Sequence, residues 1–132
     1  MAFTAVDFYH LACELREAAN GDDAKLRSAI SRAYYAAFLA ARDKANISSK
    51  GTDGHSRVIQ HYSQKPTDAV VANWLKDLKM DREAADYDMS KVCTGRTGGK
   101  SVGTARKVLE HLKALEPIPE PTAPVTDPKL LH

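Results

Sequence analysis

Residues 31–42 read Ser-Arg-Ala-Tyr-Tyr-Ala-Ala-Phe-Leu-Ala-Ala-Arg. On a helix of about 3.6 residues per turn, this segment and the residues before it form an apolar stripe along one face. The stripe consists of Leu26, Ile30, Ala33, Tyr34, Ala37, Phe38 and Ala41. The alanines add little bulk, so neighbouring helices can approach this segment closely. The segment therefore predicts a long helix at the centre of a helical bundle.

A second stripe runs along the same helix beside the first. It consists of Ser28, Arg32, Tyr35, Leu39 and Arg42. An aromatic ring flanked by two guanidinium groups is unusual for a face that only meets water. We therefore expect this stripe to contact a ligand or a second subunit.

Composition sets broad limits. A chain of 132 residues with 43% hydrophobic and 27% charged residues fits one globular domain. A net charge of +2 does not by itself indicate a nucleic-acid partner. The cysteines, Cys13 and Cys93, lack zinc-site spacing and are too few for a disulfide framework. With no signal-peptide pattern and no apolar stretch of membrane-spanning length, we expect a cytoplasmic protein. Because His10, His61 and His111 also lack a partner at metal-site spacing, we expect no metal, and we expect no cofactor.

Apolar residues recur at helical spacing in most of the chain. Besides the central helix from Asp22 or Asp23 to Ala45, we expect helices over residues 4–20, 55–62, 66–89 and 101–116. Short connections favour antiparallel neighbours. The predicted fold is all-α, an up-and-down antiparallel four-helix bundle with an additional short helix. The bundle should occupy residues 1–116, and the Pro-rich residues 117–132 should form an extended or disordered tail.

Two short motifs carry a resemblance to a known family. Residues 31–41, S-R-A-Y-Y-A-A-F-x-A-A, resemble the second-helix motif of HEPN domains, which are small helical proteins of prokaryotic defence and toxin–antitoxin systems. Residues 82–87, R-E-A-A-D-Y, resemble the fourth-helix R-x-x-A-D-Y stretch of the same family. In outline the resemblance covers residues 5–115. It implies an HEPN-like bundle, a homodimer formed through helices two and four, and RNA or a nucleotide as ligand.

The first candidate site is Arg82 with Asp86 and Tyr87. Ribonuclease members of the resembled family carry an R-x(4–6)-H motif, in which the arginine holds a phosphate and the imidazole moves a proton. Here Asp86 and Tyr87 stand where that histidine is expected. A carboxylate beside a phosphodiester repels it, so the motif predicts a degenerate or weak metal-independent ribonuclease. Alternatively, Arg82 and Asp86 form only an i,i+4 ion pair.

The second candidate site joins the two motifs. If the second and fourth helices are neighbours, Arg32, Tyr35, Arg82 and Tyr87 line one groove that offers phosphate contacts and a ring on which a base stacks. Alternatively, Tyr35 packs against a second subunit and Arg32 pairs with an acidic residue there, because both residue types are enriched at interfaces. The sequence leaves both interpretations open.

A third segment, Gly95 to Ser101, is rich in glycine and ends in Lys-Ser. A phosphate-binding loop would need a preceding strand and a glycine at position 94, which is Thr94. An anion could dock at the start of the last helix beside Arg96 and Lys100. We expect instead that this segment is a flexible connection.

Function stays open between three classes at this point. The first is an HEPN-like protein that binds RNA or a nucleotide, with catalytic candidates Arg82, Asp86 and Tyr87 and binding candidates Arg32, Tyr35 and Arg82. The second is a non-catalytic dimeric module that binds a protein partner, such as an antitoxin or a minimal nucleotidyltransferase that modifies Tyr87. The third is an assembly module without a ligand.

Overall fold

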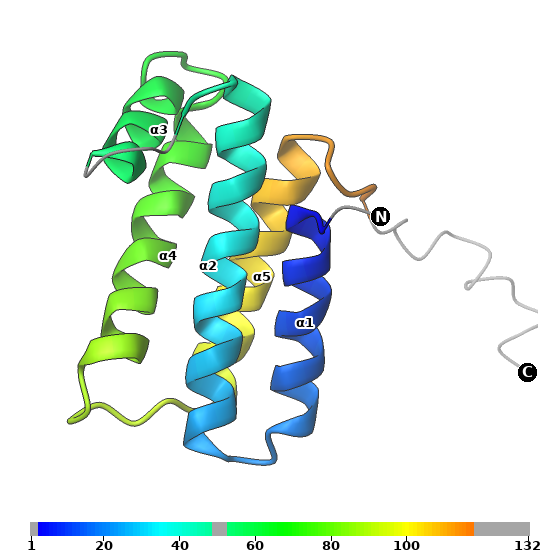
Figure 1. Cartoon of the computed structure of the whole chain (residues 1–132), viewed down its shortest axis with the longest axis vertical. Helices are drawn as coiled ribbons and strands as arrows, with labels where there is room; N and C mark the ends of the chain where they lie inside the picture. Colours follow the sequence, from blue (N-terminus) through cyan, green and yellow to red (C-terminus); the bar gives the residue numbers. More distant parts are fainter. Residues whose placement is uncertain (1–2, 49–52, 118–132) are drawn as a thin grey trace, which may run out of the picture.

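The computed structural model of the chain describes residues 3–48 and 53–117, and within these ranges all regular secondary structure is helical. The helices are α1 (Ala5–Ala18), α2 (Asp23–Ala45), α3 (Gly54–Ser63), α4 (Ala69–Tyr87) and α5 (Gly95–His111). The four long helices lie side by side and alternate in direction, and α3 packs against α4 at one end of the bundle (Figure 1). The prediction of an all-α fold is confirmed.

Local signals explain how α1 and α2 become antiparallel neighbours. Thr4 begins α1 with a capping box, in which its side chain accepts from the Asp7 amide and Asp7 accepts from the Thr4 amide. Asn20 and Gly21 have positive φ angles of 46° and 83°, which reverse the chain within a few residues. Asp22 then caps α2 by accepting from two backbone amides of its first turn. The first helix, expected over residues 4–20, therefore ends at this reversal.

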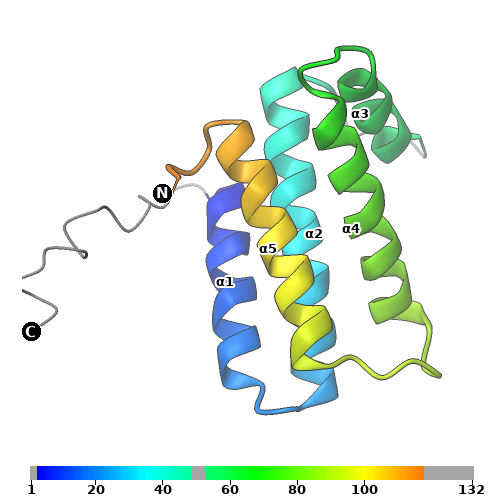
Figure 2. The same ribbon diagram turned by 180° about the vertical axis from the view of Figure 1, so that it is seen from behind.

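The centre of the bundle is α2. It contacts α1 and α4 on either side, and α5 covers its back, which Figure 2 presents from the α5 side. All seven residues of the predicted apolar stripe are buried, and Tyr34 is completely so. The second stripe keeps partial exposure, with Arg32, Tyr35 and Leu39 half-buried and Ser28 exposed. The first stripe therefore faces the core, and the second lies beside it at the edge of the buried surface.

The predicted start of the fourth helix at Pro66 is wrong. The structure begins α4 at Ala69. Residues 65–68 form a turn closed by a hydrogen bond of 3.0 Å from the Asp68 amide to the Lys65 carbonyl. Pro66 occupies the second position of this turn, where its fixed φ is favourable. The proline therefore serves the reversal between α3 and α4.

The prediction of a flexible connection from Gly95 to Ser101 is also wrong. Thr94 begins α5 with a capping box in which it exchanges hydrogen bonds with Thr97, so the helix starts six positions before Ser101. Gly98 is buried, and a Cβ atom there would lie 3.1 Å from Cδ2 of Leu26. The glycine lets α5 approach α2 closely, and this requirement comes from packing that the local sequence does not reveal.

Two further predictions concern the ends and the environment of the bundle. The last helix ends at His111, not at Glu116, and Lys113 has a positive φ of 61° just after it. Of the predicted tail, residues 118–132 lie outside the described residues. Among the helices that the structure describes, none is long and apolar enough to cross a membrane.

Candidate functional site

Arg82 is the centre of the site. Its side chain projects from α4 toward α2 and is 12% exposed. The guanidinium carbon lies 5.4 Å from the centre of the Tyr34 ring, 5.6 Å from that of Tyr35 and 5.9 Å from that of Tyr87. Cations are attracted to the faces of aromatic rings at this range. Three rings from two helices therefore hold the guanidinium.

Asp86 completes this cluster with an ion pair. Its Oδ2 atom lies 3.6 Å from Nη1 of Arg82, one helical turn earlier on α4. The same oxygen accepts a hydrogen bond of 3.4 Å from Oγ of Ser31, which is buried on α2. The two stretches that carry the family resemblance therefore contact each other. We call the group Ser31, Tyr34, Tyr35, Arg82, Asp86 and Tyr87 the Arg82 site.

His55 of α3 lies against one side of this site. Its ring stacks on Phe38 at 4.2 Å between ring centres and at 9° between planes. Nδ1 of His55 is hydrogen-bonded to the hydroxyl of Tyr34, whose ring also contacts Arg82. An imidazole is thus brought close to Arg82 from α3, whereas the sequence motif would place it on α4. The signal in the sequence was only a histidine in the first turn of a short helix.

The titration behaviour of this pair follows from its surroundings. Burial lowers the pKa of His55, and the nearby positive charges of Arg82 and Lys79 lower it further. Burial raises the pKa of Tyr34 above the ordinary value for a phenol. Both shifts favour the neutral forms at pH 7, so the imidazole and the phenol share a hydrogen bond between uncharged groups.

Arg32 lies elsewhere. Within the described residues, the side-chain interaction found for its guanidinium is with the ring of Phe8 on α1, at 5.4 Å from the ring centre. Tyr35 instead contacts Arg82 of α4 and stands edge-on to His55. The structure therefore brings Tyr35, Arg82, Asp86 and Tyr87 together, and it turns Arg32 toward the opposite neighbour of α2.

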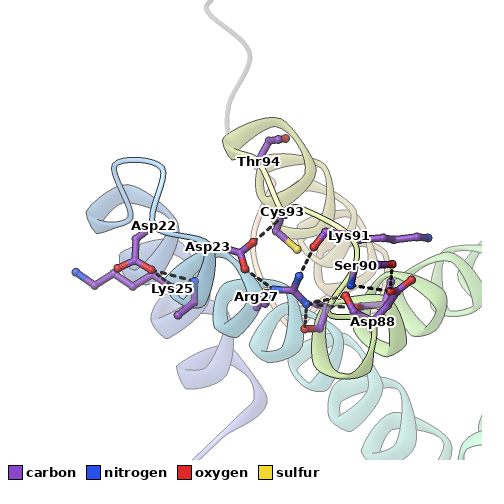
Figure 3. Close-up of polar contacts among 12 residues, drawn as sticks. Asp22, Asp23, Lys25, Arg27, Asp88, Ser90, Lys91, Cys93 and Thr94 are labelled. Carbon is purple, nitrogen blue, oxygen red and sulfur yellow. Dashed lines mark hydrogen bonds and ion pairs between the residues drawn. The ribbon is translucent and has the colours of Figure 1, made fainter.

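A second polar cluster, which the sequence analysis missed, fixes the end of α4. Arg27 of α2 donates through Nη1 to the carbonyls of Ala85 at 2.8 Å and Asp88 at 3.1 Å, and through Nη2 to the carbonyl of Lys91 (Figure 3). The last carbonyls of a helix have no partner within the helix, and a cation is favourable there. Arg27 therefore holds the turn that carries Asp86 and Tyr87.

Asp23 supports this arginine and also the next segment. One oxygen pairs with Nε of Arg27 at 2.6 Å, and the other accepts from the Cys93 amide at 2.9 Å (Figure 3). The Cys93 amide and then Arg27 hold the pKa of Asp23 below its ordinary value. The i,i+4 spacing of Asp23 and Arg27 was visible in the sequence, but the carbonyls that Arg27 meets were not.

Chemically, the Arg82 site is suited to an anion with an attached flat ring. A guanidinium carries five N–H donors, and Asp86 at 3.6 Å is farther away than in a strong charge-assisted hydrogen bond. The ring of Tyr87, which is 73% exposed, offers a surface for stacking. Within the described residues no three His, Cys, Asp or Glu side chains are grouped so that they could hold a metal ion.

Comparisons with known protein families, with curated proteins and with solved structures find no match.

Proposed function

We propose that this chain is an HEPN-like helical module of a prokaryotic defence or toxin–antitoxin system that binds RNA or a nucleotide at the Arg82 site. One observation carries the proposal: an arginine held by three tyrosine rings from the two motif-bearing helices. Arginine recognises phosphate through several donors at once, and exposed aromatic rings stack on bases. Together they provide one contact for each part of a nucleotide.

The proposal assigns weak or no metal-independent ribonuclease activity to the site. On α4, Asp86 and Tyr87 take the place of the histidine that ribonuclease relatives in the resembled family carry. Asp86 already accepts from Ser31 and pairs with Arg82, so its carboxylate orients the guanidinium. An aspartate also lacks the imidazole that takes up and releases a proton near neutral pH. Binding therefore stands ahead of cleavage.

The proposal includes a cytoplasmic homodimer. The half-buried stripe of α2 lies between α1 and α4 and presents Tyr35 and Leu39, residue types suited to a protein interface. A second copy on this face would cover the stripe and bring two Arg82 sites near one another.

The test of this function is RNA and nucleotide binding by purified full-length protein. Fluorescence anisotropy with a labelled single-stranded RNA should give about tenfold weaker binding for Arg82→Gln, because a charged contact to phosphate is lost. Arg106→Gln is a matched control, since Arg106 on α5 also lies over a tyrosine, Tyr9, and has an i,i+4 acidic partner. Equal effects of both substitutions, or no binding by the unchanged protein, would refute the proposal.

A second candidate function rests on the exposure of Tyr87. With 73% of the residue exposed at the end of α4, its hydroxyl is open to a modifying enzyme. In this alternative the chain is a non-catalytic dimeric module, and a minimal nucleotidyltransferase transfers a nucleotidyl group from a nucleoside triphosphate to the hydroxyl, with release of pyrophosphate. Mass spectrometry after incubation with such a partner should detect the added group, and Tyr87→Phe should abolish it.

A further inference from the structure

An open groove lies between α3 and α4. It has a volume of about 560 Å³, which is in the range of sites for small ligands. Ile59 and Gln60 line it from α3, and Lys76, Lys79 and Met80 line it from α4. In Figure 1, α3 lies beside the N-terminal half of α4, whereas Arg82 belongs to the C-terminal half of that helix. The groove is thus separate from that site but on the same helix.

The lining favours an anionic occupant with apolar parts. Lys76 is exposed, and Lys79 lies 4.0 Å from the carboxylate of Glu83, the acidic residue of the lining. Positive charge therefore exceeds negative charge along this stretch. Met80 is 69% exposed and supplies an apolar contact beside the two lysines. Sites for single-stranded nucleic acid combine a positively charged groove with aromatic rings on which bases stack, and Tyr87 of the Arg82 site offers such an exposed ring.

The groove ends next to the Arg82 site, because Glu83, which lines it, directly follows Arg82 on α4. Lys76, Lys79 and Arg82 follow one another at intervals of three residues, so each is a surface neighbour of the next, and the series turns about 120° around α4 over about 9 Å of its length. His55 marks the junction, because Ser56 next to it lines the groove while its own ring contacts Tyr34 and Tyr35. The positive charges of both Arg82 and Lys79 lower the pKa of His55, in agreement with this arrangement.

We propose that the α3–α4 groove is the path of a single RNA strand that starts at the Arg82 site, with Lys76 and Lys79 contacting its phosphates. This inference rests on the proposed function and extends it from one nucleotide to a strand. It predicts that a mononucleotide and a longer RNA are bound by different sets of residues. A mononucleotide uses only Arg82 and the tyrosines, whereas a longer RNA also uses the lysines.

The test compares a mononucleotide with a labelled single-stranded RNA long enough to fill both sites. The double substitution Lys76→Gln/Lys79→Gln should weaken RNA binding at least fivefold and leave mononucleotide binding unchanged. Each lost phosphate contact should also reduce the slope of log K against log salt by about 0.7, so by about 1.4 for two contacts. Lys25→Gln/Lys107→Gln is the control, since these lysines are exposed and lie outside the groove.

A gain of affinity provides a second readout that misfolding cannot imitate. Glu83→Gln removes the negative charge from the lining and should tighten RNA binding two- to fivefold. RNA binding with an unchanged salt slope in the double variant would overturn the inference but leave the proposed function standing. If the unchanged protein binds neither RNA nor the mononucleotide, both the inference and the proposed function are overturned. Lysine-dependent binding of polyglutamate without binding of RNA would also overturn the inference, because the groove would then serve an acidic protein segment.

Discussion

Two glycines of α5 give opposite predictions for stability. Gly103 is exposed in the middle of the helix, and a Cβ atom added there meets nothing within 4 Å. Gly103→Ala should therefore stabilise the protein by about 0.5–1 kcal/mol, because alanine loses less backbone entropy in a helix. Gly98 faces the buried side chain of Leu26, with only 3.1 Å available between the new Cβ and Cδ2. Gly98→Val should destabilise by about 1–2 kcal/mol after its better helix propensity is subtracted.

Thermal unfolding followed by circular dichroism measures both effects. At about 4 °C per kcal/mol for a domain of this size, Gly103→Ala should raise the Tm by about 2–4 °C and Gly98→Val should lower it by about 4–8 °C. Urea midpoints should move in the same directions. If residues 95–101 were a flexible connection, Gly98→Val would leave the Tm nearly unchanged. That result would refute the packed helix described for this segment.

Two further predictions concern the site. Because burial lowers the native pKa of His55, the unfolded chain takes up the proton first as the pH falls below about 6.5, so His55 should reduce stability there. Urea midpoints should fall less steeply below this pH in His55→Gln than in the control His10→Gln, and parallel curves would contradict the shift. Asp86→Asn removes a negative charge beside Arg82 and should tighten RNA binding two- to fivefold in anisotropy, whereas Asp77→Asn on the exposed side of α4 should not. Weaker binding by Asp86→Asn would contradict this prediction, because the positioning of Arg82 by the carboxylate would then outweigh the repulsion of the phosphate.

The sequence predicted the parts of the fold that local patterns determine. Periodic apolar residues located α2 and its buried face, and Asn20 with Gly21 located the reversal after α1. The start of α5 was missed because its glycines have low helix propensity, which usually indicates a loop. Their reason for being there is the close approach to Leu26, and that contact joins residues far apart in the chain.

In the candidate site, too, the sequence predicted some contacts and missed others. The two motifs predicted that Tyr35 and Arg82 belong together, and the structure places the ring and the guanidinium in contact. Two groups were not predicted, because their partners lie on other helices. Arg27 meets backbone carbonyls in the last turn of α4 and just after it, which no side-chain pattern indicates. Arg32 turns toward Phe8 on α1, although the helical repeat aligns it with Tyr35.

If the proposed function is right, the arrangement of charges separates phosphate binding from proton transfer in this site. In the resembled ribonucleases, both roles belong to one helix, which carries the arginine and the histidine. Here α4 supplies Arg82 together with a carboxylate that holds it, and the imidazole comes from α3 through the hydroxyl of Tyr34. Because that hydroxyl already occupies Nδ1 of His55, only the other ring nitrogen is left for a substrate. In the proposed function, α4 contacts a phosphate through Arg82 without an imidazole on the same helix, which is why we place binding before cleavage.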